Sequence, residues 1–96
     1  MFIRIGADGA VTLEEAADLR RLSIHTAATP AADAALSRLT RADGADHAWI
    51  APQRIRELAR STAKDWDDGF AAMLAYASGK GWTDAAGAVR AHIERD

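Results

Sequence analysis

The residues of this chain whose type best suits metal binding or proton transfer are its three histidines, His25, His47 and His92. His25 and His92 lie on the polar faces of two alternating segments, and His47 begins a short apolar run. The three rings would therefore meet if those segments were neighbours in a sheet. Their spacing matches no local ligand motif, such as two histidines four residues apart on a helix. We expect separate, exposed histidines and no bound metal or other cofactor, with these three residues as the only candidates for a metal site.

Aromatic side chains in the second half of the chain favour a binding surface. Tyr76 lies off the apolar stripe of its expected helix, and Trp82 follows closely spaced glycines, so neither is committed to the core. Arg90 and His92 fall on the polar face of the last alternating segment. Exposed Tyr, Trp and Arg side chains are typical of interaction sites and pocket rims. We predict a binding surface made of Tyr76, Trp82, Arg90, His92 and His25.

Sequence signatures of catalysis are absent. The chain has no Gly-x-Ser-x-Gly elbow, no phosphate-binding loop, no dinucleotide fingerprint and no cysteine. Its acidic runs, at residues 43–46 and 65–68, lack the ligand spacing of a calcium loop and are typical of turns and helix starts. We therefore expect no catalytic residues. A small His-based or metal-dependent enzyme remains an alternative.

Length and composition predict a single small domain with a thin core. The chain has 96 residues, enough for one domain but not for two cores. Hydrophobic residues make up 49% of it, yet many of these are alanine. The large side chains expected to form the core are Trp49, Trp66, Phe70, Leu74 and Trp82.

The net charge of −2 gives the chain no basic field, so nucleic acid is disfavoured as a partner. The sequence contains no run of about 18 apolar residues and no signal-like amino-terminal segment. We expect no membrane association and a cytoplasmic location.

The first third of the chain predicts two strands separated by an ambiguous segment. Residues 2–5 are rich in β-branched side chains and end at a glycine, and residues 22–27 alternate between apolar and polar positions. Both patterns are typical of strands.

The ambiguous segment carries signals for both a helix and a strand. Thr12 and Glu15 have the spacing of a capping box, in which each side chain accepts from the other residue's backbone amide. This pattern predicts a short helix over residues 13–21. The alternative is a hairpin closed by the preceding Asp-Gly pair, with residues 10–13 as its second strand. We favour the helix because the capping box is the more specific pattern.

The middle of the chain predicts two helices and a short strand. A Thr-Pro pair at residues 29–30 starts the first helix, and an Asp-Gly pair at residues 43–44 is expected to end it. Residues 47–50 predict a short strand or an extended lead into the second helix, which begins at Pro52. The apolar stripe of that second helix is Ile55, Leu58, Ala59 and Thr62.

The stretch from residue 65 to residue 94 predicts the longest helix and the last strand. Three aspartates favour a helix start near Asp65, and Gly79 and Gly81 favour an end near Ser78. Residues 89–94 alternate and predict a strand. The apolar stripe of the helix is Trp66, Phe70, Met73, Leu74 and Ala77.

These elements have the order β-α-β-α-β-α-α-β. They predict a small α+β domain spanning residues 1–96, with a mixed sheet of three to four strands covered mainly on one face by three to four helices. The last strand is expected to lie at a sheet edge that is open to strand addition.

The absence of catalytic motifs and the thin core predict a binding module that acts as a homodimer, another homo-oligomer or a subunit of a larger assembly. A winged-helix DNA-binding regulator is the alternative, because two helices followed by a strand resemble that motif in outline. The three aspartates at the start of its would-be recognition helix argue against it, since phosphate would repel them.

Overall fold

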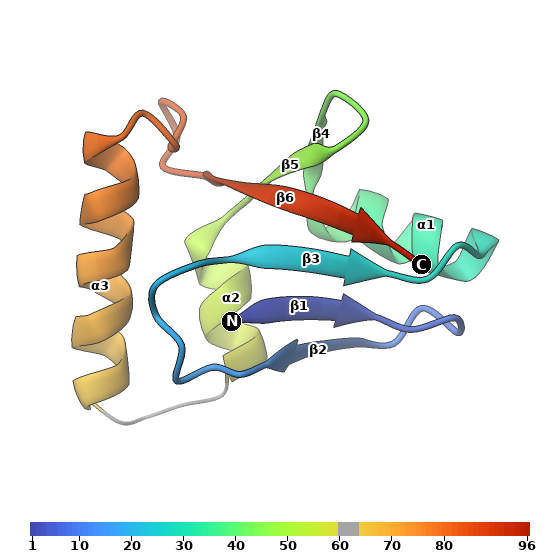
Figure 1. The fold of residues 1–96 in the computed structure, drawn as a ribbon, viewed down its shortest axis with the longest axis horizontal. Coiled ribbons are helices and arrows are strands. Elements are labelled where there is room, and N and C mark those ends of the chain that lie inside the picture. Colours follow the sequence, from blue (N-terminus) through green and yellow to red (C-terminus); the bar gives the residue numbers. More distant parts are fainter. Residues whose placement is uncertain (60–63) are drawn as a thin grey trace.

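The computed structural model describes residues 1–59 and 64–96, and this part of the chain forms a mixed six-stranded sheet with three helices (Figure 1). The strands are β1 (Phe2–Ile5), β2 (Val11–Glu14), β3 (Ser23–Thr26), β4 (Arg41–Asp43), β5 (His47–Ile50) and β6 (Val89–Arg95). The helices are α1 (Pro30–Leu39), α2 (Pro52–Ala59) and α3 (Lys64–Gly79). The strand order is β2-β1-β3-β6-β5-β4, in which β3 is parallel to β1 and β6, and the other neighbours are antiparallel.

The structure is an α+β fold, but the prediction of three to four strands is wrong because two further strands form. One of them, β2, replaces the helix expected over residues 13–21. The hairpin alternative holds there, and β2 pairs antiparallel with β1. The Thr12 hydroxyl donates to the Glu14 carboxylate at 3.2 Å instead of capping a helix. Pairing with β1 lets Val11 and Leu13 pack against the core, which a short exposed helix could not do.

The other unpredicted strand is β4. Helix α1 begins as expected, with the Thr29 hydroxyl accepting from the Ala32 amide, but it ends at Leu39 and not at residues 43–44. Thr40 caps it there, since its backbone amide donates to the carbonyl oxygen of Leu36. The Asp-Gly pair is therefore a hairpin turn between β4 and β5, and Gly44 supplies the left-handed residue with a φ of 72°.

Strand β6 is central, which corrects its expected place at an edge. It pairs with β3 on one side and with β5 on the other, so its backbone is not free for strand addition. It is also not an exposed wing, which the winged-helix interpretation requires. The edges of the sheet are β2 and β4.

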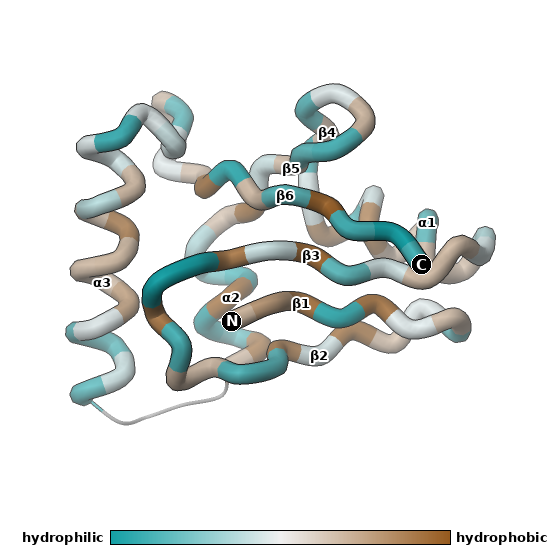
Figure 2. The backbone as a smooth tube through the Cα atoms, viewed as in Figure 1, coloured by the Kyte–Doolittle hydropathy of each residue, from teal (hydrophilic) through white to brown (hydrophobic). Residues whose placement is uncertain are grey.

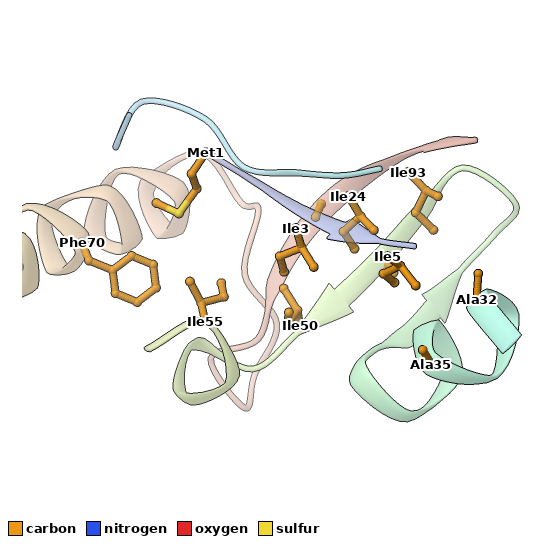
Figure 3. Packing of buried hydrophobic residues seen from close by; sticks show 12 residues of the cluster. Met1, Ile3, Ile5, Ile24, Ala32, Ala35, Ile50, Ile55, Phe70 and Ile93 are labelled. Atoms are coloured by element: carbon orange, nitrogen blue, oxygen red, sulfur yellow. The ribbon is translucent and has the colours of Figure 1, made fainter. Parts of the chain in front are cut away.

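One face of the sheet forms the core against α1 and α2 (Figures 1 and 3). Hydrophobic and hydrophilic residues alternate along β1, β3 and β6, so each strand has one buried and one polar side (Figure 2). Helix α3 stands at the end of the sheet, where Phe70 reaches toward Ile55 and Met1 (Figure 3). In the described part of the chain, the largest fully buried hydrophobic side chains are Ile3, Ile5, Ile24, Ile50, Ile55 and Phe70.

The predicted core residues of α3 are confirmed, whereas the prediction that Trp49 and Trp82 belong to the core is wrong. Phe70 is fully buried, and Trp66 and Leu74 pack against the core. Trp49 is only half-buried and lies on the polar face of the sheet, and Trp82 is 47% exposed. Helix α2 begins at Pro52 as expected, whereas the stripe residue Thr62 lies outside the described residues. None of the described helices combines the length and apolar character needed to cross a membrane.

Candidate binding surface

The five residues predicted to bind lie around two neighbouring hollows. The first, which we call the aromatic cleft, has a volume of about 330 Å³ and includes Tyr76, Trp82 and Arg90. The second, the histidine hollow, has a volume of about 430 Å³ and includes His25 and His92. Both hollows share Arg21 and Leu22 as lining residues, so they adjoin. Their role in binding stays a prediction. The other residues of the aromatic cleft used below are Arg20, Met73, Ala77 and Val89.

Tyr76 and Trp82 are the large hydrophobic side chains that stand out from the surface of the described residues, with exposed fractions of 60% and 47%. Their rings meet edge to face, with centroids 6.0 Å apart and an interplanar angle of 67°. The ammonium group of Lys80 lies 5.5 Å from the centroid of the Tyr76 ring. The two exposed rings and a cation thus form one patch.

The end of α3 holds Trp82 in this position. Gly81, with a φ of 78°, reverses the chain after the helix. The Trp82 amide then donates to the carbonyl oxygen of Ala77 at 2.9 Å, and the Gly81 amide donates to that of Ser78 at 3.1 Å. This is the Schellman pattern of helix termination. The carbonyl oxygen of Trp82 accepts from the Arg90 amide at 2.9 Å, which ties the residue to β6.

The loop between β2 and β3 supplies two arginines of the cleft and runs alongside α3 (Figure 1). The Met1 amino group donates to the carbonyl oxygens of Asp18 and Arg21 at 2.9 and 3.0 Å. The Trp66 indole donates to the carbonyl oxygen of Ala16 at 2.8 Å. These bonds fix the loop to β1 and to α3, and so they set where Arg20 and Arg21 lie.

Two arginines of the aromatic cleft have carboxylate neighbours outside it. Arg90 Nε lies 2.7 Å from Asp43 Oδ2, and Arg20 Nε lies 3.6 Å from Asp18 Oδ1. The backbone amide of Arg20 donates to Asp18 and holds the pKa of that carboxyl below its usual value, helped by the charges of the amino terminus and of Arg20. Because a guanidinium has five N–H donors, each arginine keeps donors for a ligand.

The histidine hollow contains a serine, a histidine and a glutamate in contact. The Ser23 hydroxyl and the Glu94 carboxylate both lie 3.2 Å from the same atom, Nε2 of His25. A proton relay of the Ser-His-acid type needs one ring nitrogen for each partner. The His25 ring also stacks on Phe2, with centroids 4.3 Å apart. The cluster therefore does not have the geometry of a catalytic triad.

The three histidines do share the polar face, but they do not converge on one point. His47 and His92 are cross-strand partners whose ring centroids lie 5.2 Å apart. His25 is the cross-strand partner of Glu94 instead. Among residues 1–59 and 64–96, no three His, Cys, Asp or Glu side chains are grouped so that they could hold a metal ion.

Sequence reasoning missed Arg20, Arg21, Leu22 and Met73 as parts of the surface. It placed the two arginines at the end of a helix that does not form. The available signal was the Arg-Arg pair directly before an alternating strand, but its proximity to α3 depends on long-range packing. Comparison of the chain with protein-family models, with curated proteins and with solved structures found no match, so the geometry alone supports a functional interpretation.

Proposed function

We propose that the protein is a binding module that holds another protein through the aromatic cleft. One observation carries this proposal. The two large hydrophobic side chains most exposed in the described part of the chain, Tyr76 and Trp82, lie in the same cleft and not apart. Isolated exposed apolar residues are common and need no explanation, whereas grouped aromatic residues beside arginines are typical of the centre of protein interfaces.

The energetics of the cleft support this role. Covering the exposed parts of both rings removes on the order of 200 Å² of apolar surface from water, which is worth about 5 kcal/mol before the costs of association. Leu22 and Met73 extend the apolar lining beside the rings. The cleft can therefore anchor a partner, and the rest of the contact would supply shape and charge complementarity.

The charges of the cleft favour a different protein over a second copy at this surface. Arg20, Arg21 and Arg90 line it, and none of the described residues that line it is acidic. A twofold symmetric dimer would bring the same basic patch of each copy together, and like charges across an interface cost free energy. Of the predicted modes of association, membership of a larger assembly fits this surface better than homodimerisation.

Site-specific photocrosslinking tests the proposal. A photoreactive residue in place of Lys80, at the rim of the aromatic cleft, should give a discrete crosslinked product in an extract of the source cells. The matched control position for the photoreactive residue is Ala45, which is also exposed but lies in the hairpin between β4 and β5. The product from position 80 should disappear with excess unlabelled protein and persist with excess Tyr76→Ala/Trp82→Ala protein.

The mass of the product identifies the kind of partner. A mass equal to two copies of the chain would show self-association, and any other mass would show a different protein. Equal competition by the wild type and by the double variant would contradict the proposal, because the aromatic pair would then contribute nothing to the contact.

A further inference from the structure

We infer that the partner segment bound by the aromatic cleft is acidic: it inserts one aromatic or branched apolar side chain into the cleft and places carboxylates beside that side chain. This inference rests on the proposed function and specifies the chemistry of the partner. Two independent features of the cleft carry it, namely the size and apolar lining of its interior and the charge of its rim.

The interior of the cleft is small and apolar. Leu22, Met73, Ala77 and Val89 form its apolar lining beside the two exposed rings. Its volume of about 330 Å³ lies at the lower end of the range for ligand pockets, so it suits one large side chain and not a folded element. An aromatic ring would meet the edges or faces of Tyr76 and Trp82, which are favourable geometries for aromatic pairs.

The rim of the cleft is basic although the chain as a whole has a net charge of −2. Arg20, Arg21 and Arg90 line it, and Lys80 lies against Tyr76. The nearby carboxylates of Asp18 and Asp43 each contact one of these arginines, as described above. None of the described residues that line the cleft is acidic, so its rim is positive, although Glu15 and Glu94 line the adjoining histidine hollow with Arg21. Exposed guanidinium groups bind carboxylates through paired hydrogen bonds.

A second copy of the chain has its densest acidic run beside an aromatic residue at the start of α3. Asp65, Asp67 and Asp68 are exposed there, but the Trp66 between them stacks on Phe70 with centroids 5.0 Å apart. The N–H of its indole also donates a hydrogen bond to the carbonyl oxygen of Ala16. Trp66 is thus not available as an anchor, and we assign the cleft to a different protein.

Fluorescence polarisation with labelled peptides and the full chain tests the inference. The probe is fluorescein-Asp-Glu-Phe-Leu-Asp-amide, with the label on its amino terminus. One comparison peptide replaces its three acidic residues with lysine, and a second replaces Phe and Leu with alanine. We expect the acidic Phe-Leu peptide to bind at least tenfold more tightly than either comparison peptide. An oligothymidylate of similar charge is the anionic control and should bind more weakly than the probe.

Two charge-reversal variants distinguish the effect of the rim's charge on binding from the effect of the protein's net charge. Arg21→Glu should weaken binding of the probe about tenfold, because it turns an attraction into a repulsion. Arg38→Glu makes the same change in net charge on α1, away from the aromatic cleft, and should change the affinity less than twofold. Trp82→Ala or Tyr76→Ala should weaken binding of the probe about thirtyfold if the rings form the anchor. Thermal melting of each variant would show that it is folded.

The outcomes distinguish this inference from the proposed function. If the lysine peptide binds as well as the probe, and Trp82→Ala still abolishes binding, the aromatic cleft is a binding site but its partner is not acidic. If the oligothymidylate binds most tightly, or if no peptide binds, the inference is wrong. Self-association that Arg21→Glu abolishes would also overturn it, because the occupant would then be a second copy.

Discussion

Two tryptophans, one within α3 and one just past its end, show how position decides the role of the same side chain. Trp66 stacks on the buried Phe70 and donates its indole N–H to the loop between β2 and β3. Trp82 lies past the left-handed turn at Gly81, and almost half of its surface faces water. The first residue therefore contributes to folding, and the second is free to contribute to binding.

Replacing each tryptophan with alanine should give very different losses of stability. Trp66→Ala removes packing against the core and one hydrogen bond, and should cost about 3 kcal/mol. Trp82→Ala should cost less than about 1 kcal/mol, because substitutions at exposed positions have small effects. Urea unfolding of both variants measures the difference. Equal losses would show that Trp82 is part of the core and would weaken the case for an interaction surface.

Asp18 should make stability depend on pH at low pH. Its folded-state pKa is lowered, chiefly by the hydrogen bond from the Arg20 amide, so its carboxylate stabilises the fold at pH values above its unfolded-state pKa. That contribution is lost as the pH falls through the lower, folded-state value. Asp18→Asn should therefore be less stable than the wild type at neutral pH, and the gap should close below about pH 4. A gap that stays constant down to pH 2 in urea titrations would contradict this assignment.

At the scale of elements, local signals predicted the segments that depend on local chemistry. The cap at Thr29 and the start at Pro52 form as expected because neighbouring residues determine them. The apolar stripe of α3 faces the core, as its helical spacing predicts. The capping-box pattern at Thr12 failed because, once paired with β1, Val11 and Leu13 pack against the core, and β2 also packs with α2 far along the chain. The capping-box spacing does not reflect those long-range contacts. Strand β4 was not predicted because the Asp-Gly pair of its turn, at residues 43–44, also has the sequence typical of a helix end.

The hairpin between β1 and β2 offers a test of this long-range packing. Gly9 has a φ of 85°, and a Cβ at this position would lie 2.9 Å from the carbonyl oxygen of Ala31 in α1. Gly44 has a similar φ of 72° in the other hairpin, where a Cβ would point into open space with nothing within 4 Å. Gly44→Ala should cost about 1 kcal/mol from backbone strain, and Gly9→Ala about 2 kcal/mol or more because it adds the collision with α1.

Thermal or urea unfolding of the two glycine variants provides the measurement. The difference between them isolates the contact of the hairpin with α1, because both carry the same left-handed strain. If Gly9→Ala is no more destabilising than Gly44→Ala, the hairpin does not pack on α1 as the structure shows.

For the whole molecule, the strand order brings together the segments that make the surface. Residues 20–22 precede β3, Tyr76 belongs to the last turns of α3, Trp82 follows that helix, and Arg90 belongs to β6, yet all of them line one cleft. The sequence predicted Tyr76, Trp82 and Arg90 as a group because each is polar or exposed in its own element. It could not place Arg20 and Arg21 beside them, because that requires β3 and β6 to be neighbours.

The tryptophan indole signals in a nitrogen-15 NMR spectrum test the central claim most directly. The chain has three tryptophans, one on the polar face of the sheet, one packed against the core and one in the aromatic cleft. During titration with the crosslinked partner or with the acidic probe peptide, we predict that the Trp82 signal shifts while those of Trp49 and Trp66 stay in place. A shift of Trp49 with an unchanged Trp82 would place binding on the polar face of the sheet and would contradict the assignment of the aromatic cleft.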